Sequence, residues 1–247
     1  MALKTTLNYS PNFNPKKRPS KQIKFIIFHY TGMKSESDAL KRLTDIQSEV
    51  SCHYLVKING EILKMVPDSY IAWHAGKSSW KNYKSLNQNS IGIEITNSGH
   101  KHGYKNFTKK QITALLKLSK FLIKKYKVSP KNILGHSDIA VLRKKDPGEK
   151  FPWKYLSKNK IGIWHKLNKQ DLIKNRKLKI SKIEESIFFR SLFKIGYSKE
   201  YPKDKDKNKY LRELTKNFQR RFRQELVNGK IDQECLLISK SLIKAYD

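Results

Sequence analysis

The pattern of apolar and polar positions predicts β-strands in several parts of the chain. The apolar run rich in Ile and Phe at residues 23–31 is typical of a buried strand, and residues 89–97 indicate another, with Glu94 inside it. Residues 51–66 alternate between apolar and polar and turn at Asn59-Gly60, which predicts a β-hairpin. The Asn-Gly dipeptide favours a type I′ turn at its tip.

Two further segments follow the helical period instead. Apolar positions three and four residues apart predict helices over residues 38–46 and 107–127, and Thr108 is placed to cap the longer one. Strands with helices between them indicate an α/β fold, with a central mixed β-sheet flanked by helices.

The pattern changes after Trp153. Residues 157–179 are rich in Lys and Asn, and three helical patterns follow: IEESIFFRSLFKIGY, LRELTKNFQRRFR and ECLLISKSLIKAY, the first two separated by the charged loop YPKDKDKNKY. We therefore place a boundary near residues 170–180, with a small all-helical module after it. The expected parts are an N-terminal arm of residues 1–22, an α/β domain of residues 23–175 and a helical module of residues 180–247.

The net charge is high, because 53 Lys and Arg residues stand against 21 Asp and Glu, giving +32. Such a field attracts polyanions: nucleic acid, anionic lipid headgroups or anionic wall polymers. The lysines are spread along the chain with Asn and Ile, which also fits a compositional bias. The basic segment FQRRFR suggests nucleic acid, but neither an aromatic-and-basic RNA signature nor a clear helix-turn-helix accompanies it. We expect no specific nucleic-acid partner.

The cysteines and the apolar segments bear on the cellular location of the protein. Cys52 and Cys235 are too few to form a disulfide framework. Residues 1–20 contain no long apolar run, and no later stretch reaches the length of a transmembrane segment. This pattern fits a cytoplasmic protein, a protein whose leader has been removed, or export by another route.

Three polar residues stand at positions suited to metal binding. His29 ends an apolar strand, His136 follows Gly135, and Asp146 precedes a Pro-Gly turn that fixes the direction of its carboxylate. Two imidazoles and one carboxylate form the open zinc site of a hydrolase, with water in the fourth position. A single histidine is usually structural, and the long separations are no local zinc-finger signature. From spacing alone the three residues remain a hypothesis.

Glu94 and Lys144 each allow two interpretations. Glu94 lies inside the apolar SIGIEIT, where it either points out of a half-buried strand or acts as a general base beside a metal-bound water. Lys144 either stabilises a developing oxyanion or belongs to an ordinary basic loop. Composition alone favours the basic loop.

Five segments together carry a family resemblance. They resemble the zinc-dependent N-acetylmuramoyl-L-alanine amidases of the AmpD and AmiD type, which are related to the peptidoglycan-recognition proteins and phage T7 lysozyme. The resemblance covers roughly residues 20–156. Its motifs are FHYT (28–31), CHYLVKINGEI (52–62), AWHAG (72–76), NSIGIEI (89–95) and GHSDIA…KKDPGEKFPW (135–153).

The resemblance implies both a reaction and roles for particular residues. The reaction is zinc-dependent hydrolysis of the amide between N-acetylmuramic acid, or its anhydro form, and L-alanine, in peptidoglycan or its fragments. The implied roles are zinc ligands for His29, His136 and Asp146, activation of water for Glu94, stabilisation of the tetrahedral intermediate for Lys144, and contact with the substrate or support of its cleft for His74 and Asn89.

Two departures from the family pattern matter. Val141-Leu142 replaces a Pro-Gly pair in the loop before Lys144, and Cys52 stands where phage-type relatives have a tyrosine. Glu94 must therefore act without that tyrosine. The alternative function is a non-catalytic peptidoglycan-recognition binder, but such binders typically lose a metal ligand, and this chain keeps all three.

The C-terminal segment 218–243 carries a second likeness. It resembles the last part of a three-helix peptidoglycan-binding module, with an aromatic-Gln-Arg helix, a Gly-X-Ile-Asp turn and an apolar helix. The alternative is a generic helical cap. The module favours a secreted or cell-envelope location, whereas the missing leader favours the cytoplasm. The family resemblance leads us to expect a secreted or cell-envelope protein, with the cytoplasm as the alternative.

Overall fold

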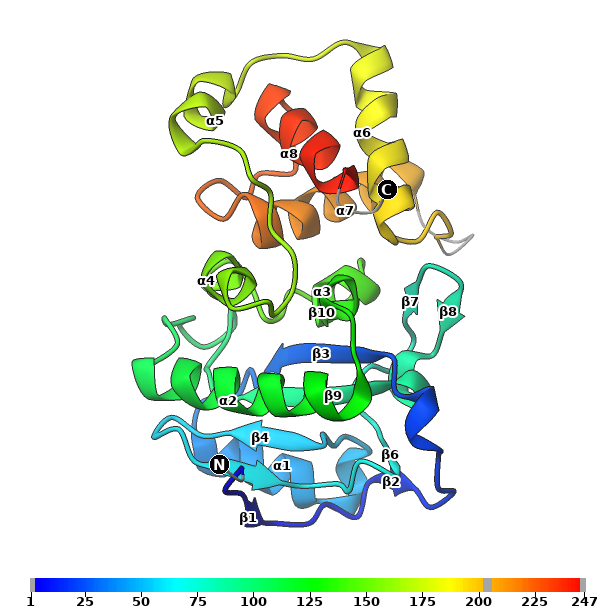
Figure 1. Cartoon of the computed structure of the whole chain (residues 1–247), viewed down its shortest axis with the longest axis vertical. Coiled ribbons are helices and arrows are strands. Elements are labelled where there is room, and N and C mark those ends of the chain that lie inside the picture. Colours follow the sequence, from blue (N-terminus) through cyan, green and yellow to red (C-terminus); the bar gives the residue numbers. More distant parts are fainter. Residues whose placement is uncertain (1–2, 202–205, 245–247) are drawn as a thin grey trace.

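A six-stranded mixed β-sheet forms the centre of the computed structural model, which describes residues 3–201 and 206–244. The strand order is β1-β5-β4-β9-β3-β10 (Figure 1). Strands β4, β9, β3 and β10 are parallel, β5 is antiparallel to β4, and β1 is parallel to β5. The strands are β1 (Thr6–Leu7), β3 (Phe25–Tyr30), β4 (Tyr54–Val56), β5 (Ile62–Lys64), β9 (Ser90–Ile95) and β10 (Ile133–Gly135). The predicted mixed α/β fold is confirmed.

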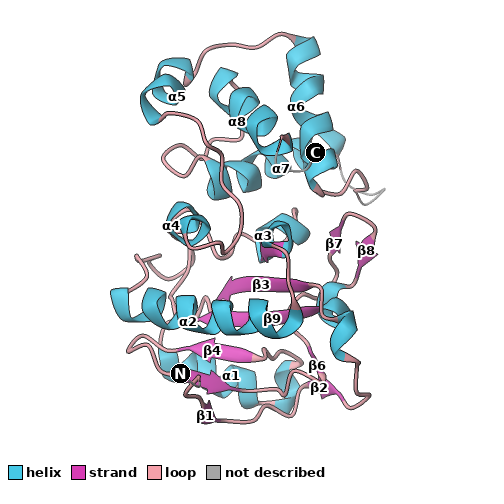
Figure 2. Cartoon of the chain, viewed as in Figure 1, coloured by secondary structure: helices cyan, strands magenta, loops and turns pink. Residues whose placement is uncertain are grey.

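The N-terminal arm lies along this sheet in its described part. Strand β1 extends the sheet beyond β5, and β2 (Phe13–Asn14) pairs with β6 (Ile71–Ala72) in a separate two-stranded ribbon. A second ribbon joins β7 (Ser79–Trp80) to β8 (Tyr83–Lys84) (Figure 2). The first two residues of the predicted arm lie outside the described residues.

Helices cover both faces of the sheet. Helix α2 (Lys109–Tyr126) packs its apolar stripe on one face, and Thr108 forms the predicted N-cap as part of a capping box with Gln111. Helix α1 (Glu36–Thr44) lies on the other face, where Leu43 packs against Leu55 of β4. The alternation of side chains along each strand therefore sends one set of residues towards each layer.

The hairpin between β4 and β5 is confirmed, but its predicted turn type is wrong. Gly60 has φ +86°, whereas Asn59 is not among the residues with positive φ, and a type I′ turn requires both. The N–H of Lys57 donates to the carbonyl of Glu61, which closes a three-residue loop. A Cβ on Gly60 would lie 2.8 Å from the carbonyl oxygen of Lys110, so the tip packs closely on α2.

Helices α5 to α8 form the C-terminal helical region beyond the β10 edge of the sheet (Figure 1). The pattern after Trp153 predicted three of its helices and missed the short α4 and α5. The predicted charged loop 201–210 includes residues 202–205, which are not described. Two short helices precede this region, α3 (His136–Ile139) and α4 (Trp153–Lys158). The helices of the region itself are α5 (Lys169–Asn175), α6 (Lys182–Ile195), α7 (Lys207–Phe222) and α8 (Gln233–Ile243). Within residues 3–201 and 206–244, no helix has the length and apolar character to cross a membrane.

The C-terminal helical region shares a hydrophobic core with the sheet domain. One cluster of buried side chains joins Ile27 and Leu134 of the sheet to Leu192, Phe218 and Leu236 of the helices. The predicted boundary near residues 170–180 is thus not a break in packing.

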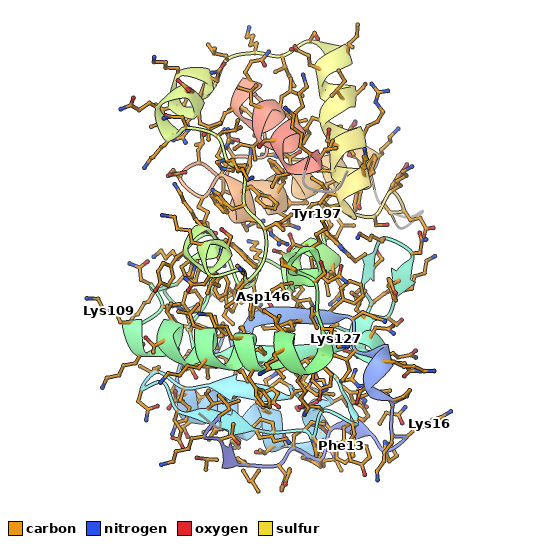
Figure 3. The ribbon with its side chains drawn as sticks, in the orientation of Figure 1. Phe13, Lys16, Lys109, Lys127, Asp146 and Tyr197 are labelled. Atoms are coloured by element: carbon orange, nitrogen blue, oxygen red, sulfur yellow. The ribbon has the colours of Figure 1, made fainter. Side chains whose placement is uncertain are left out.

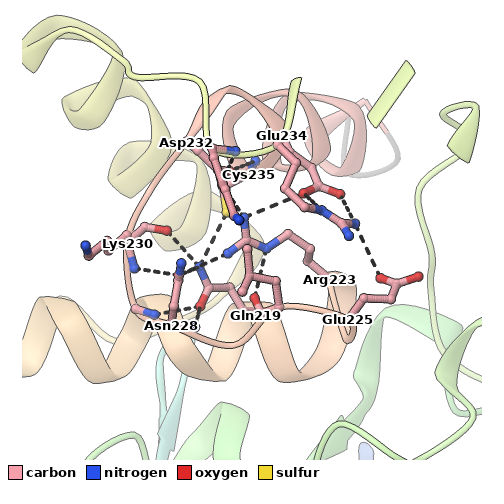
Figure 4. A network of polar contacts seen from close by, with 12 residues as sticks. Gln219, Arg223, Glu225, Asn228, Lys230, Asp232, Glu234 and Cys235 are labelled. Atoms are coloured by element: carbon pink, nitrogen blue, oxygen red, sulfur yellow. Dashed lines mark hydrogen bonds and ion pairs between the residues drawn. The ribbon is translucent and has the colours of Figure 1, made fainter. Parts of the chain in front are cut away.

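Polar residues organise the interior of the helical region (Figure 4). Gln219 accepts hydrogen bonds from the backbone N–H groups of Asn228 and Gly229, at 3.0 and 2.8 Å. The fully buried Arg223 pairs with Asp232, which also caps α8. The Gln-Arg motif and the Gly-X-Ile-Asp turn therefore build one folded unit.

Candidate metal centre and active site

Two neighbouring strands bring His29 and Glu94 together. They are register partners in parallel β3 and β9, so their side chains leave the same face of the sheet. This face is opposite α2, because Ile93 and Ile95 point towards that helix. His29 is 1% exposed and Glu94 9% exposed.

The chain after β10 supplies His136 and Asp146. Strand β10 ends at Gly135, His136 begins α3, and the N–H of Ser137 donates to the carbonyl of Asp146 at 2.9 Å. A Cβ on Gly135 would lie 2.7 Å from Cδ of Pro147, so glycine lets the returning loop approach the strand. Asp146 consequently lies between the sheet and the helical region (Figure 3).

The predicted ligand set converges on one point. His29 Nδ1 lies 2.9 Å from His136 Nδ1, and Asp146 Oδ2 lies 3.1 Å from each of these nitrogens. A triangle with these sides has a point about 2.0–2.1 Å from all three atoms, which is the bond length of zinc to imidazole nitrogen and carboxylate oxygen. These buried residues could hold a metal ion.

A chain of hydrogen bonds orients His29. Ser90 Oγ donates to the carbonyl of Leu86 at 2.6 Å, so it accepts from Nε2–H of His74 at 3.1 Å. His74 Nδ1 is then an acceptor and receives Nε2–H of His29 at 3.0 Å. This order leaves the Nδ1 lone pair of His29 directed at His136 and Asp146, as a metal ligand requires.

His136 is oriented through its other ring nitrogen. Its Nε2–H donates to the carbonyl of Ala75 at 3.1 Å, and the Arg143 guanidinium donates to the same oxygen. Asn87 Oδ1 accepts the backbone N–H groups of His74 and Ala75, which fixes this segment under both histidines.

Burial and neighbouring charges set the protonation of the ligands. Burial, reinforced by the nearby His136, lowers the pKa of His29 to about 4. Burial opposes ionisation of Asp146, but the two histidines outweigh it and hold the pKa of that carboxyl well below its usual range. At neutral pH the site therefore presents a neutral His29 beside a carboxylate.

Glu94 is suited to proton exchange near neutral pH. Burial raises its pKa to about 8, the charge of Asp146 adds to the rise, and Lys144 opposes it. Its buried Oε2 has no hydrogen-bond partner among the described residues. A carboxyl with a pKa near neutrality and an unpaired oxygen is suited to exchanging protons with a reacting group.

A pocket of about 510 Å³ opens over these groups, and Glu94, His136 and Asp146 line it together with His74. In the described part of the chain its only acidic lining residues are Glu94 and Asp146. The remaining charge is positive, from Arg42, Lys101, Arg143, Lys144 and Lys145.

The structure thus brings five predicted residues together: His29, Glu94, His136, Lys144 and Asp146. His74 lines the pocket but also lies behind His29 as its hydrogen-bond partner, so its contact with substrate stays a prediction.

The structure does not bring Asn89 to the pocket. It precedes β9, five residues before Glu94, or roughly 17 Å along a strand. Its side chain donates to the carbonyl of Gln22 at 3.3 Å, and it does not line the pocket. Asn87, not Asn89, holds the backbone of His74 and Ala75 at the site. In the sequence, Asn87 was marked only by its place two residues before the NSIGIEI motif.

Two imidazoles and a carboxylate around one point, beside an unpaired buried glutamate in a pocket, are suited to metal-assisted hydrolysis. The comparisons with known proteins agree with this class. A family model described as N-acetylmuramoyl-L-alanine amidase matches residues 19–149. The amidase AmiD of Escherichia coli is 35% identical over 240 residues, which cover 91% of this chain and 84% of AmiD. The chain belongs to the N-acetylmuramoyl-L-alanine amidase family.

Solved structures extend this likeness to the helical region. The complex of E. coli AmiD with anhydro-N-acetylmuramic acid-L-Ala-D-γ-Glu-L-Lys superposes with a TM-score of 0.77 at 34% identity, covering 91% of this chain and 90% of AmiD. AmpDh3 of Pseudomonas aeruginosa gives the same TM-score at 30% identity, over 98% of this chain and 99% of that one.

Proposed function

We propose that this chain is a zinc-dependent N-acetylmuramoyl-L-alanine amidase. Its reaction is hydrolysis of the amide between N-acetylmuramic acid, or its anhydro form, and L-alanine. The observation that carries the proposal is the triangle of His29, His136 and Asp146 donor atoms next to the unpaired Oε2 of Glu94. Family membership and the muropeptide bound to AmiD support the same substrate class.

Each side chain has a distinct part in the reaction. His29, His136 and Asp146 would hold the zinc ion, which supplies a Lewis acid and lowers the pKa of water. Glu94 takes a proton from the attacking water at Oε2 and returns it to the nitrogen of L-alanine as the amide bond breaks. Lys144, half-buried at the pocket wall, offsets the negative charge that develops on the carbonyl oxygen.

Product analysis tests the proposal directly. The protein is incubated with anhydromuramyl-tripeptide and with whole sacculi, with and without a chelator, and the products are identified by mass. We expect release of free tripeptide or stem peptide only in the metal-replete samples, with recovery when zinc is restored. If neither substrate releases peptide, the proposed amidase activity is wrong.

The same assay separates the amidase from a non-catalytic binder. Asp146→Ala removes one of the three donor atoms while leaving the cationic rim of the pocket intact. An amidase then loses turnover, whereas a binder retains its affinity for the muropeptide. The expected location in the cell envelope stays a prediction, which fractionation of producing cells would test.

A further inference from the structure

Helix α7 of the C-terminal helical region reaches the segment that carries His136. Arg221 forms a buried ion pair with Asp138, two residues after His136. The other arm of the same guanidinium donates to the carbonyl of Ile133, three residues before His136, at 2.9 Å. The group also stacks on Trp153, 4.4 Å from its ring centroid. The Arg221 side chain thus binds residues that come before and after His136 in the chain.

Two further residues of the helical region reinforce this contact. Asn217 donates to the carbonyls of Ser137 and Val141, both at 3.0 Å. The Tyr197 hydroxyl donates to the second oxygen of Asp138 at 2.7 Å. Side chains from the helical region therefore bind the backbone or side chains of this segment at four residues: Ile133, Ser137, Asp138 and Val141.

The chemistry of this contact indicates positioning. Arg221 is 2% exposed and Asp138 1% exposed. A buried ion pair adds little net stability compared with apolar residues of the same size, because both charges lose their hydration. The planar guanidinium does, however, set direction, since its two arms bind two groups in a fixed geometry. Ile133 lies on β10, an edge strand of the six-stranded sheet. Its carbonyl therefore accepts a hydrogen bond from Arg221 on the side where the sheet ends.

We propose that Arg221 and Asn217 are positioning residues of the metal centre. They hold residues 133–141, and through them His136, at the spacing that binds the ion. The C-terminal helical region would then complete the catalytic site, a role that its likeness to a wall-binding module does not include. This inference rests on the proposed function in that it requires a metal at His29, His136 and Asp146.

The chain offers a matched pair of variants. Arg221 and Arg223 lie at the same end of α7, both are buried, and each pairs with a buried aspartate. The partner of Arg223, Asp232, belongs to the helical region itself (Figure 4). Arg221→Met and Arg223→Met therefore remove equivalent interactions, of which only the first reaches the metal-bearing segment.

Zinc affinity of the full-length variants is measured by competition with a chromophoric chelator, without substrate. We expect Arg221→Met to weaken binding about tenfold, the lower end for loss of an outer-shell partner. Arg223→Met should stay within about twofold of wild type while lowering the unfolding temperature. Arg221→Lys should give an intermediate affinity, since a single ammonium cannot reproduce the fork.

Asn217→Ala decides the matter if Arg221→Met does not fold. It removes the two hydrogen bonds to the metal-bearing segment and one from Arg220, and it leaves every charge in place. Weaker zinc binding by Asn217→Ala supports the inference. Unchanged affinity in every folded variant overturns it, as does equal weakening in Arg223→Met. If the wild-type protein itself binds no zinc, the proposed function fails, and that outcome is distinct from the others.

Discussion

The substitution His74→Leu tests how the metal centre is built. It leaves Nε2–H of His29 without an acceptor and Ser90 Oγ without a donor, in a region where both groups are buried. Each buried polar group left unsatisfied costs about 1–3 kcal/mol. The part that acts on the metal is the freed rotation and tautomer of His29, and loss of such a partner typically weakens metal binding 10–100-fold.

We therefore expect zinc affinity to fall by roughly 1.4–2.8 kcal/mol, at about 1.4 kcal/mol per tenfold. Chelator competition without substrate measures it and excludes any contribution from substrate contacts of His74. His74→Gln is the matched control, because its amide carries an acceptor for His29 and a donor for Ser90. Zinc binding by folded His74→Leu at wild-type strength, or no advantage of glutamine over leucine, would refute this reasoning.

Three further outcomes follow from the same geometry. Lys144→Met should lower kcat about 10²–10³-fold with zinc affinity nearly unchanged, which steady-state kinetics would show; a wild-type kcat would return Lys144 to the ordinary basic loop. In chelator-treated protein, the contribution of Glu94 to stability should fall as pH rises from about 4.5 to about 8, because the folded chain retains a proton on Glu94 that the unfolded chain releases. Denaturant unfolding at pH 5 and pH 8 should show wild type losing stability relative to Glu94→Gln, since the buried histidines such as His29 act in the opposite direction but equally in both proteins. The same stability difference at both pH values would contradict the raised pKa. Gly135→Ala should weaken zinc binding, because its Cβ would displace Pro147 next to Asp146; an unaltered affinity would show that the loop tolerates the shift.

The sequence predicted the sheet, its two main covering helices and the ligand set because each depends on local pattern or on motifs in a fixed order. Register was not readable from it. His29 and Glu94 become neighbours only when β3 and β9 align, and the same alignment carries Asn89 away from the pocket. Short helices such as α4 and α5 lack enough turns to show a period, and the hairpin loop depends on packing against α2.

The contact between α7 and the metal-bearing segment was also beyond the sequence. Arg221 and Asp138 are 83 residues apart, and each stands in a motif that suggests a purpose within its own segment. A basic FQRRFR run reads as a solvated or nucleic-acid-binding surface, yet Gln219, Arg221 and Arg223 are buried and paired. Only the fold shows that this run is interior.

The cationic rim of the pocket has a kinetic consequence. Five positive side chains line the pocket together with the two buried acidic ones, so the field at the entrance draws anions inward. At an ionic strength of about 0.1 M such attraction extends only about 10 Å. Encounter with a carboxylate-bearing ligand should therefore slow as salt is added, whereas bond cleavage, which takes place beneath the rim, should proceed at the same speed.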